Sequence, residues 1–153
     1  MWTLLIITLL FHIVSVILHI DDTIPFSKII LDLIRKIMYD KNNIFAQIIA
    51  KTTSARIVYE DEELLAFNDI KPVMPTHIII IPKKEYIDYN DFITNASDKE
   101  IKNYFTKIAY IAKTLGLDKD GYRLITNNGL NLGQTIFHFH FHLISGNNIT
   151  NLI

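Results

Sequence analysis

The stretch Gly133-Gln134-Thr135-Ile136-Phe137-His138-Phe139-His140-Phe141-His142 places three histidines in strict alternation with three phenylalanines, behind a polar turn that begins with glycine. In a β-strand, side chains at every second position share a face. The pattern therefore predicts a final strand from His138 to Ser145 that carries its histidines on one face and its phenylalanines on the other. The phenylalanine face is apolar, and the histidine face carries groups that can bind a ligand or take part in catalysis.

Three roles suit such a face. A single histidine on a half-buried strand is usually structural, but three at strict alternation are less readily explained in that way. Metal binding is a second role, because imidazole is the commonest metal ligand and two histidines at positions i and i+2 can share one ion. At about 3.4 Å per residue, however, the outer two histidines stand roughly 14 Å apart at the backbone. The chain also has no cysteine and no HExxH helix to complete a metal site.

The third role is covalent catalysis at phosphorus. A central imidazole can attack phosphorus if its other ring nitrogen is held in the right tautomer and nearby donors receive the developing negative charge. The turn offers such donors in Gln134 and Thr135, and Gly133 lets the backbone approach a phosphate closely. This layout is typical of a site that handles phosphoryl groups.

The residues HFHFHLI after GQT resemble the signature of the histidine triad (HIT) family, His-x-His-x-His followed by two apolar residues. Upstream, IVYEDEELLAFNDIKPVMPTHIIIIPKK resembles the segment before the triad in the branch of nucleoside phosphoramidases and related nucleotide-binding proteins. With IFAQIIAK and GYRLITNNG, the resemblance covers the chain from Ile44 to Gly146.

The resemblance implies a catalytic role for four histidines. His140 would be the nucleophile on the α-phosphorus of a nucleotide, giving a covalent nucleotidyl-histidine that water then hydrolyses. His138 and His77 would orient and polarise its ring. The phosphate oxygens would be bound by the turn that begins at Gly133 and by the side chains of His142, Gln134, Thr135 and Asn127. This scheme requires no metal and no cofactor.

The resemblance also implies a purine nucleotide substrate, without separating adenine from guanine. Asp69 would hold the ribose hydroxyls. Apolar side chains would wall the base: Ile44, Phe45, Ile48, Phe67 and Ile70. The leading function is a nucleotidyl hydrolase that cleaves purine nucleoside phosphoramidates or related compounds. The alternatives are a dinucleoside polyphosphate hydrolase, a nucleotide-binding or interaction module with incidental catalysis, and a metal-binding protein.

The element pattern predicts an α+β domain with an antiparallel sheet of about five strands, one long helix and one short helix. Asn43 would cap the short helix, over residues 44–49. The long helix would begin at a capping box formed by Ser97 and Glu100 and end at Gly116. The strands before the last are expected at Arg56–Tyr59, Leu64–Phe67, Thr76–Ile81 and Tyr122–Thr126. The resemblance to the HIT family also implies that the protein forms a homodimer.

Composition sets further bounds. The 153 residues carry a formal net charge of −1, so no electrostatic argument favours binding to nucleic acid. The absence of cysteine excludes disulfides, thiolate catalysis and cysteine-based zinc sites. Half of the residues are hydrophobic, which is enough for one domain with a core.

The chain divides into a hydrophobic N-terminal extension, residues 1–37, and a HIT-like domain, residues 38–153. Trp2–Ile20 is uncharged and apolar over about the 20 residues that a spanning helix needs, and the basic residues after it would leave the domain in the cytoplasm. The second interpretation is that translation begins at Met38 and that the extension is an over-called start. Peptides from Ile24–Lys36 in the native protein would refute it. Both interpretations predict a cytoplasmic domain, with a membrane contact only in the first.

Overall fold

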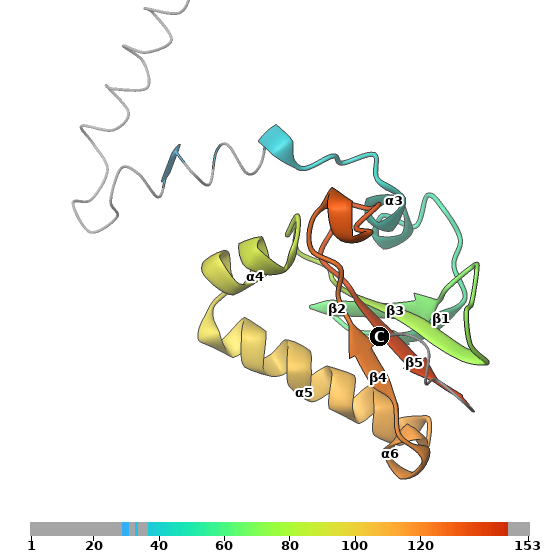
Figure 1. Ribbon diagram of the computed structural model, residues 1–153. Helices are drawn as coiled ribbons and strands as arrows, with labels where there is room; N and C mark the ends of the chain where they lie inside the picture. Colours follow the sequence, from blue (N-terminus) through green and yellow to red (C-terminus); the bar gives the residue numbers. More distant parts are fainter. Residues whose placement is uncertain (1–28, 31–32, 34–36, 147–153) are drawn as a thin grey trace, which may run out of the picture. The chain divides into compact units, whose positions relative to one another are not determined.

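The computed structural model describes residues 29–30, 33 and 37–146, which Figure 1 colours along the sequence. The chain divides into two compact units, Met1–Met38 and Tyr39–Ile153. In the first unit the described residues are helical. The second unit carries every residue predicted for the site.

The predicted membrane span, Trp2–Ile20, lies outside the described residues. Among the residues that are described, no helix has both the length and the apolar character needed to cross a membrane. The alternative start at Met38 stays a prediction for mass spectrometry of the native protein.

The second unit is built on one five-stranded sheet whose neighbouring strands are all antiparallel. In spatial order the strands are β1 (Ile57–Glu60), β2 (Leu64–Asn68), β3 (Thr76–Pro82), β5 (Phe141–Ser145) and β4 (Arg123–Ile125). The central position of β3 explains its continuous apolar sequence, because both of its faces are covered. The α+β class and the sheet of five strands are therefore confirmed.

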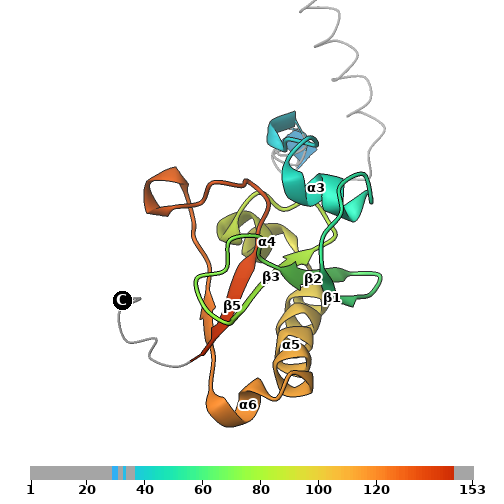
Figure 2. The same ribbon diagram turned by 90° about the vertical axis from the view of Figure 1, so that its right-hand side faces the viewer.

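The helices comprise one long helix and several short ones, arranged as Figures 1 and 2 show. They are α3 (Ile44–Ile49), α4 (Tyr89–Asn95), α5 (Asp98–Thr114), α6 (Leu117–Asp120) and the 3-10 turn η1 (Leu130–Leu132). Sequence patterning predicts α3 and α5 but misses the other three. Their few residues carry too little helical periodicity to be recognised.

Local capping explains where the two predicted helices begin and end. The side chain of Asn43 accepts the N–H of Ala46 at 2.9 Å and starts α3. At the start of α5, Ser97 accepts the N–H of Glu100 while the Glu100 carboxylate accepts the N–H of Ser97, which is a complete capping box. Gly116, at φ +74°, lets the chain turn away after α5.

Alternation along the strands separates two apolar clusters, one on each face of the sheet. On the first face, β2, β3 and the segment Phe139–Leu143 pack against α5. On the second face, Phe45 and Ile48 of α3 pack against β2 and β3. The register sets Ile79 of β3 opposite His142 of β5, so the histidines share the α3 face. The two predicted faces, apolar and chemical, are thus found.

The last strand begins three residues later than predicted, at Phe141 instead of His138. Extending the β3–β5 register would bring Phe139 opposite Pro82, which has no N–H to donate to a ladder. The N–H of Phe139 instead donates to the carbonyl of Tyr86 at 2.7 Å. Phe137, expected on the apolar face, is 40% exposed. His138 and His140 therefore lie in the irregular segment that leads into β5, with a bend at residues 136–138.

Candidate active site

His140 lies at the centre of the candidate site with its ring orientation fixed by the backbone. Its Nδ1 is 2.7 Å from the carbonyl oxygen of His138, which can only accept, so Nδ1 carries the proton. In the neutral ring the other nitrogen, Nε2, then holds a lone pair. Burial lowers the pKa of His140 below its usual value of 6.5, so the ring is neutral at pH 7. The ring is in the form that a nucleophile requires.

His138 is fully buried and both of its ring nitrogens are occupied. Nε2 is 2.8 Å from the carbonyl oxygen of Pro82 and donates to it. Nδ1 then accepts the hydroxyl proton of Tyr39. Burial lowers the pKa of His138 to about 4. With no free lone pair, His138 can position its neighbours but cannot attack a substrate.

His77 and His142 form a pair whose proton positions follow from a backbone donor. The N–H of Val73 donates to Nδ1 of His77 at 3.2 Å, so the proton of neutral His77 is on Nε2. Nε2 donates to Nδ1 of His142 at 2.9 Å. The remaining nitrogen of His142, Nε2, must then carry a proton. Burial and the neighbouring His140 lower the pKa of His142 to about 4.

The rings of His140 and His142 are 5.0 Å apart and nearly perpendicular. The hydrogen-bond network thus gives His140 a lone pair on Nε2 and gives the neighbouring ring of His142 an N–H donor on its own Nε2. A nucleophile and a donor side by side are what attack on a phosphorus centre needs, because the phosphoryl oxygens gain negative charge as the bond forms.

Asp69 lies at the end of β2, next to this pair. Its Oδ1 accepts the N–H of Lys71 at 2.7 Å, which closes a turn, and its Oδ2 is 3.4 Å from Nε2 of His77. The carboxylate is partly exposed, so it keeps acceptor capacity for a ligand beside the histidines.

The glycine-led turn is built partly as predicted. Gly133 has φ +87°, a conformation that other residues rarely adopt, and a Cβ added there would lie 3.8 Å from the amide nitrogen of Asn127. Among the described residues, the side chains of Asn127 and Thr135 have no hydrogen-bond partner, so their donors are available to a ligand.

Gln134 has a different role from the one predicted. It is only 1% exposed, its Oε1 accepts the N–H of Gly129 at 2.8 Å, and its Nε2 donates to the carbonyl of Ile87 at 2.8 Å. Nε2 also donates to the carbonyl of Ile136 at 3.4 Å, so the amide holds the turn to the chain before α4 and has no donor left for phosphate. This corrects the prediction of Gln134 as a phosphate ligand.

The apolar residues predicted for the base fall into two groups. Phe45, Ile48 and Phe67 are buried together on the α3 face, and the ring of Phe45 is 5.1 Å from that of His140. Ile44 is 40% exposed and Ile70 is 94% exposed. The first group forms a wall next to the central histidine, and the second stands in solvent.

Two side chains that contact the histidines or their backbone are not predicted by any pattern in the sequence. Tyr39 contacts His138 across 99 positions of the chain. Thr126 donates its hydroxyl to the carbonyl of His140 at 2.9 Å and holds the backbone there. Each is an ordinary residue by composition and spacing, and only the tertiary fold brings it to the histidines.

A possible metal site is formed by three residues whose ligand atoms, one from each, all lie within 4.8 Å of one another: Asp69, His77 and His142. A neutral histidine that binds a metal through one nitrogen carries its proton on the other. Nδ1 of His77 faces the N–H of Val73 and so holds a lone pair there. The network favours hydrogen-bonded histidines over a metal at this position.

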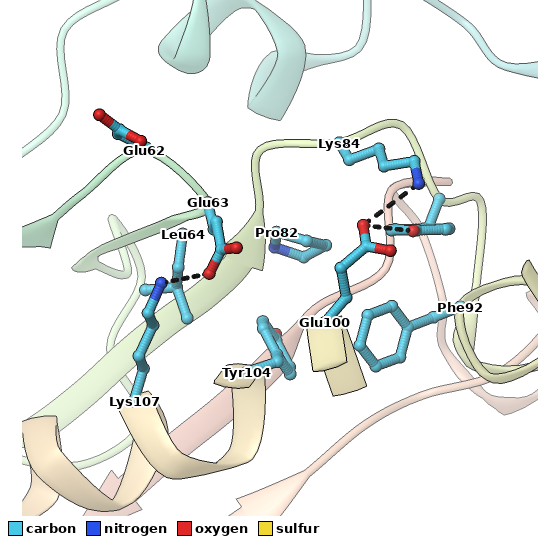
Figure 3. A pocket seen from close by; sticks show the side chains of 10 residues that line it. Glu62, Glu63, Leu64, Pro82, Lys84, Phe92, Glu100, Tyr104 and Lys107 are labelled. Carbon is cyan, nitrogen blue, oxygen red and sulfur yellow. Dashed lines mark hydrogen bonds and ion pairs between the residues drawn. The ribbon is translucent and has the colours of Figure 1, made fainter. Parts of the chain in front are cut away.

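A separate pocket of about 230 Å³ lies on the α5 side of the sheet and contains none of the histidines (Figure 3). Its apolar floor includes Leu64 and Tyr104. The ion pairs at its rim join Lys107 to Glu63 at 2.6 Å and Lys84 to Glu100 at 3.1 Å. Because these charges already have partners, the histidines remain the candidate active site.

Comparison with known proteins agrees with the geometry. The family model described as HIT domain matches residues 50–149. An uncharacterized HIT-like protein of Rickettsia prowazekii is 62% identical over 116 residues, covering 76% of this chain and 97% of that protein. A purine nucleoside phosphoramidase of Escherichia coli is 39% identical over 106 residues, covering 69% and 88%. A 14 kDa zinc-binding protein of Zea mays is 43% identical over 110 residues, covering 70% and 84%.

Solved structures show the same architecture. A histidine triad protein from Clostridium difficile superposes with a TM-score of 0.66 at 37% identity, covering 76% of this chain and all of that one. The match to the family model spans more than half of the chain and includes all four histidines of the site. The chain belongs to the HIT domain family.

Proposed function

We propose that this protein is a nucleotidyl hydrolase that cleaves purine nucleoside phosphoramidates, or related compounds in which a nucleoside monophosphate is joined to a leaving group, through a covalent intermediate on His140. One observation carries the proposal: the Nδ1 proton of His140 is bound to a carbonyl, which leaves Nε2 as the free lone pair at the centre of the site. The similarity to a phosphoramidase supports hydrolysis of nucleotides.

In the first step Nε2 of His140 attacks the α-phosphorus. The new N–P bond forms as the bond from phosphorus to the leaving group breaks, and the leaving group departs with the bonding pair and takes up a proton from water. The ring becomes positively charged, and the carbonyl of His138 stabilises that charge through Nδ1–H. Nε2–H of His142, with Asn127 and Thr135, would bind the phosphoryl oxygens.

In the second step water attacks the same phosphorus. The N–P bond breaks, its electron pair returns to Nε2 of His140, and the proton lost by the water goes to solvent. The nucleoside monophosphate is then released. Burial, full or partial, lowers the pKa of all four histidines and supports this cycle, because His140 begins and ends it as a neutral ring with Nε2 unprotonated.

The nucleoside would lie along the α3 face. Phe45, Ile48 and Phe67 form an apolar wall beside His140 on which a purine can pack. Exposed Ile44 and Ile70 would cover the base from the solvent side. Asp69 would accept the ribose hydroxyls through the part of its carboxylate that is free of the turn.

Two alternatives remain: a dinucleoside polyphosphate hydrolase and a zinc-binding protein. Substrate preference would distinguish the first from this proposal, and metal content would distinguish the second. A dinucleoside polyphosphate hydrolase would use the same nucleophile and differ in leaving group. A zinc-binding role is favoured by the name of the maize relative and by the grouping of Asp69, His77 and His142. The proton positions of His77 and His142 weigh against it.

The homodimer implied by the family is also proposed. β4 is an edge strand, and Tyr122 and Leu124 in and beside it are each 36% exposed. On α5, Phe105 is 39% exposed. An open edge flanked by exposed apolar side chains is suited to pairing with a second copy. Light scattering on the purified protein would test this.

The proposed function is tested by mixing the protein with an adenosine phosphoramidate in the presence of a chelator and measuring AMP. We expect turnover by the wild-type protein and none above background by His140→Ala. Turnover that disappears with the chelator and returns with zinc would move the assignment to metal catalysis. No turnover of the phosphoramidate together with cleavage of diadenosine polyphosphate would favour the second enzyme class.

A further inference from the structure

Tyr39 makes a hydrogen bond that the proposed catalytic cycle does not yet use. Its side chain is 5% exposed, and its hydroxyl is 2.5 Å from Nδ1 of His138, 99 positions along the chain. The two rings meet edge to face at 5.6 Å between centroids. This residue lies ahead of the segment that the family model matches, residues 50–149.

The direction of this hydrogen bond follows from the other side of the ring. Nε2 of His138 donates to the carbonyl of Pro82, so Nδ1 of the neutral ring is an acceptor and the phenol is the donor. The ring of His138 is thus held at both nitrogens, by β3 on one side and by Tyr39 on the other. A fully buried imidazole held in this way has one tautomer and one orientation.

The backbone carbonyl of His138 is the acceptor that fixes His140. Holding the ring of His138 therefore also holds the group that keeps the Nδ1 proton of His140 in place. As Nε2 attacks, positive charge develops on the His140 ring, and the carbonyl must stay within hydrogen-bond distance to stabilise it. The Tyr39 hydroxyl interacts with His138 and with the side chain of Asn43, and neither of these is a reacting group or a predicted nucleotide ligand.

A compact turn brings Tyr39 to this position. The carbonyl of Asp40 accepts both the backbone N–H and the side-chain amide of Asn43, at 3.2 and 2.6 Å. The same Asn43 caps α3, whose Phe45 packs against His138 and His140. The turn, the helix cap and the apolar wall form one unit, so Tyr39 is delivered by ordered structure.

We infer that Tyr39 is a positioning residue for the reaction, acting through the ring and the carbonyl of His138 on the nucleophile His140. The inference rests on the proposed function. Because the base and phosphate contacts are elsewhere, loss of the hydroxyl should lower kcat and leave KM unchanged. A lost hydrogen bond of this kind corresponds to a fall in kcat of about tenfold.

The test compares Tyr39→Phe with Tyr59→Phe in the full chain. Tyr59 is the control, since its hydroxyl donates to the Asp61 carboxylate at 2.9 Å in a partly buried position on β1, which β2 and β3 separate from β5. We expect kcat for the adenosine phosphoramidate to fall about tenfold in Y39F at unchanged KM and to stay at the wild-type value in Y59F. Equal effects in the two variants, or no effect in Y39F, would overturn the inference.

Nitrogen NMR of the imidazoles supplies a readout that does not depend on turnover. In the wild-type protein, Nε2 of His138 should be the protonated nitrogen and Nδ1 a hydrogen-bonded acceptor, and the Nδ1 signal should move in Y39F alone. The opposite tautomer in the wild-type protein would overturn the inference even if Y39F failed to fold. If the wild-type protein showed no turnover, the proposed function would fail, and an unchanged Nδ1 signal in Y39F would separately refute the role of Tyr39.

Discussion

His77 offers a sharp test of the proton positions, because two substitutions separate the functions of its two nitrogens. An asparagine amide reaches about as far as Nδ1, and a glutamine amide reaches about as far as Nε2. His77→Asn keeps an acceptor for the N–H of Val73 but removes the donor to His142. His77→Gln keeps a donor to His142 and gives up the contact with Val73.

The expected magnitude follows from the hydrogen bond that His77→Asn removes. The bond from Nε2 of His77 to Nδ1 of His142 is 2.9 Å long and partly buried. A neutral hydrogen bond of this kind contributes about 1 kcal/mol, which corresponds to roughly a fivefold change in rate if the transition state uses it fully. Without that donor, nothing in the network keeps the His142 proton on Nε2. We therefore expect a roughly fivefold lower kcat/KM in H77N.

His77→Gln should retain most of the wild-type kcat/KM, because its amide can still donate to His142. The hydrogen bond from the N–H of Val73 is only partly buried, so water can replace the lost acceptor, and stability should change little. The assay is AMP release from an adenosine phosphoramidate, with urea unfolding as the measure of stability. Equal kcat/KM for the two variants, or a greater loss in H77Q, would refute the proton assignment for this pair.

Three further predictions concern stability. Burial lowers the pKa of His138 to about 4, so between pH 6.5 and 4 the unfolded chain binds a proton that the folded protein does not. From this group, the free energy of unfolding by urea should be on the order of 2 kcal/mol lower at pH 5 than at pH 7. The dependence of this free energy on pH should be weaker in His138→Asn. A pH-independent stability would contradict it. Ser97→Ala breaks the capping box of α5 and should reduce stability by about 1 kcal/mol at unchanged turnover; a change in kcat would show that the cap matters for the site. Gly133→Ala places a side chain on a residue with φ +87°, so it should lower the free energy of unfolding by about 1–2 kcal/mol and should also lower turnover. Wild-type stability in this variant would show that the turn can relax.

The sequence predicts the parts of this fold that depend on local periodicity. The alternation of histidine and phenylalanine gives the two faces of the last segment, because the period of a strand is two residues. Ser97 with Glu100 predicts the start of α5, since both groups of a capping box lie within one turn. The apolar run Ile78–Ile81 likewise predicts the central strand.

The parts that the sequence does not predict depend on contacts across the chain. The start of β5 depends on Pro82, which ends β3 and offers a carbonyl but no N–H. The role of Gln134 depends on which acceptors lie near it, because an amide serves a backbone turn as well as a phosphate. Tyr39 reaches His138 only because the turn before α3 folds against the sheet. None of these contacts has a fixed spacing in the sequence.

The proposal that His140 is the nucleophile is tested most directly by trapping the intermediate. The protein would be mixed with an adenosine phosphoramidate, quenched in alkali because a phosphorus–nitrogen bond is labile in acid, and digested for mass spectrometry. We expect an adenylyl group that fragmentation of the peptide places on His140, and none in His140→Ala. An adenylyl group on His138 or His142 in the wild-type protein, or turnover without any adduct even on the timescale of a single turnover, would contradict the assignment.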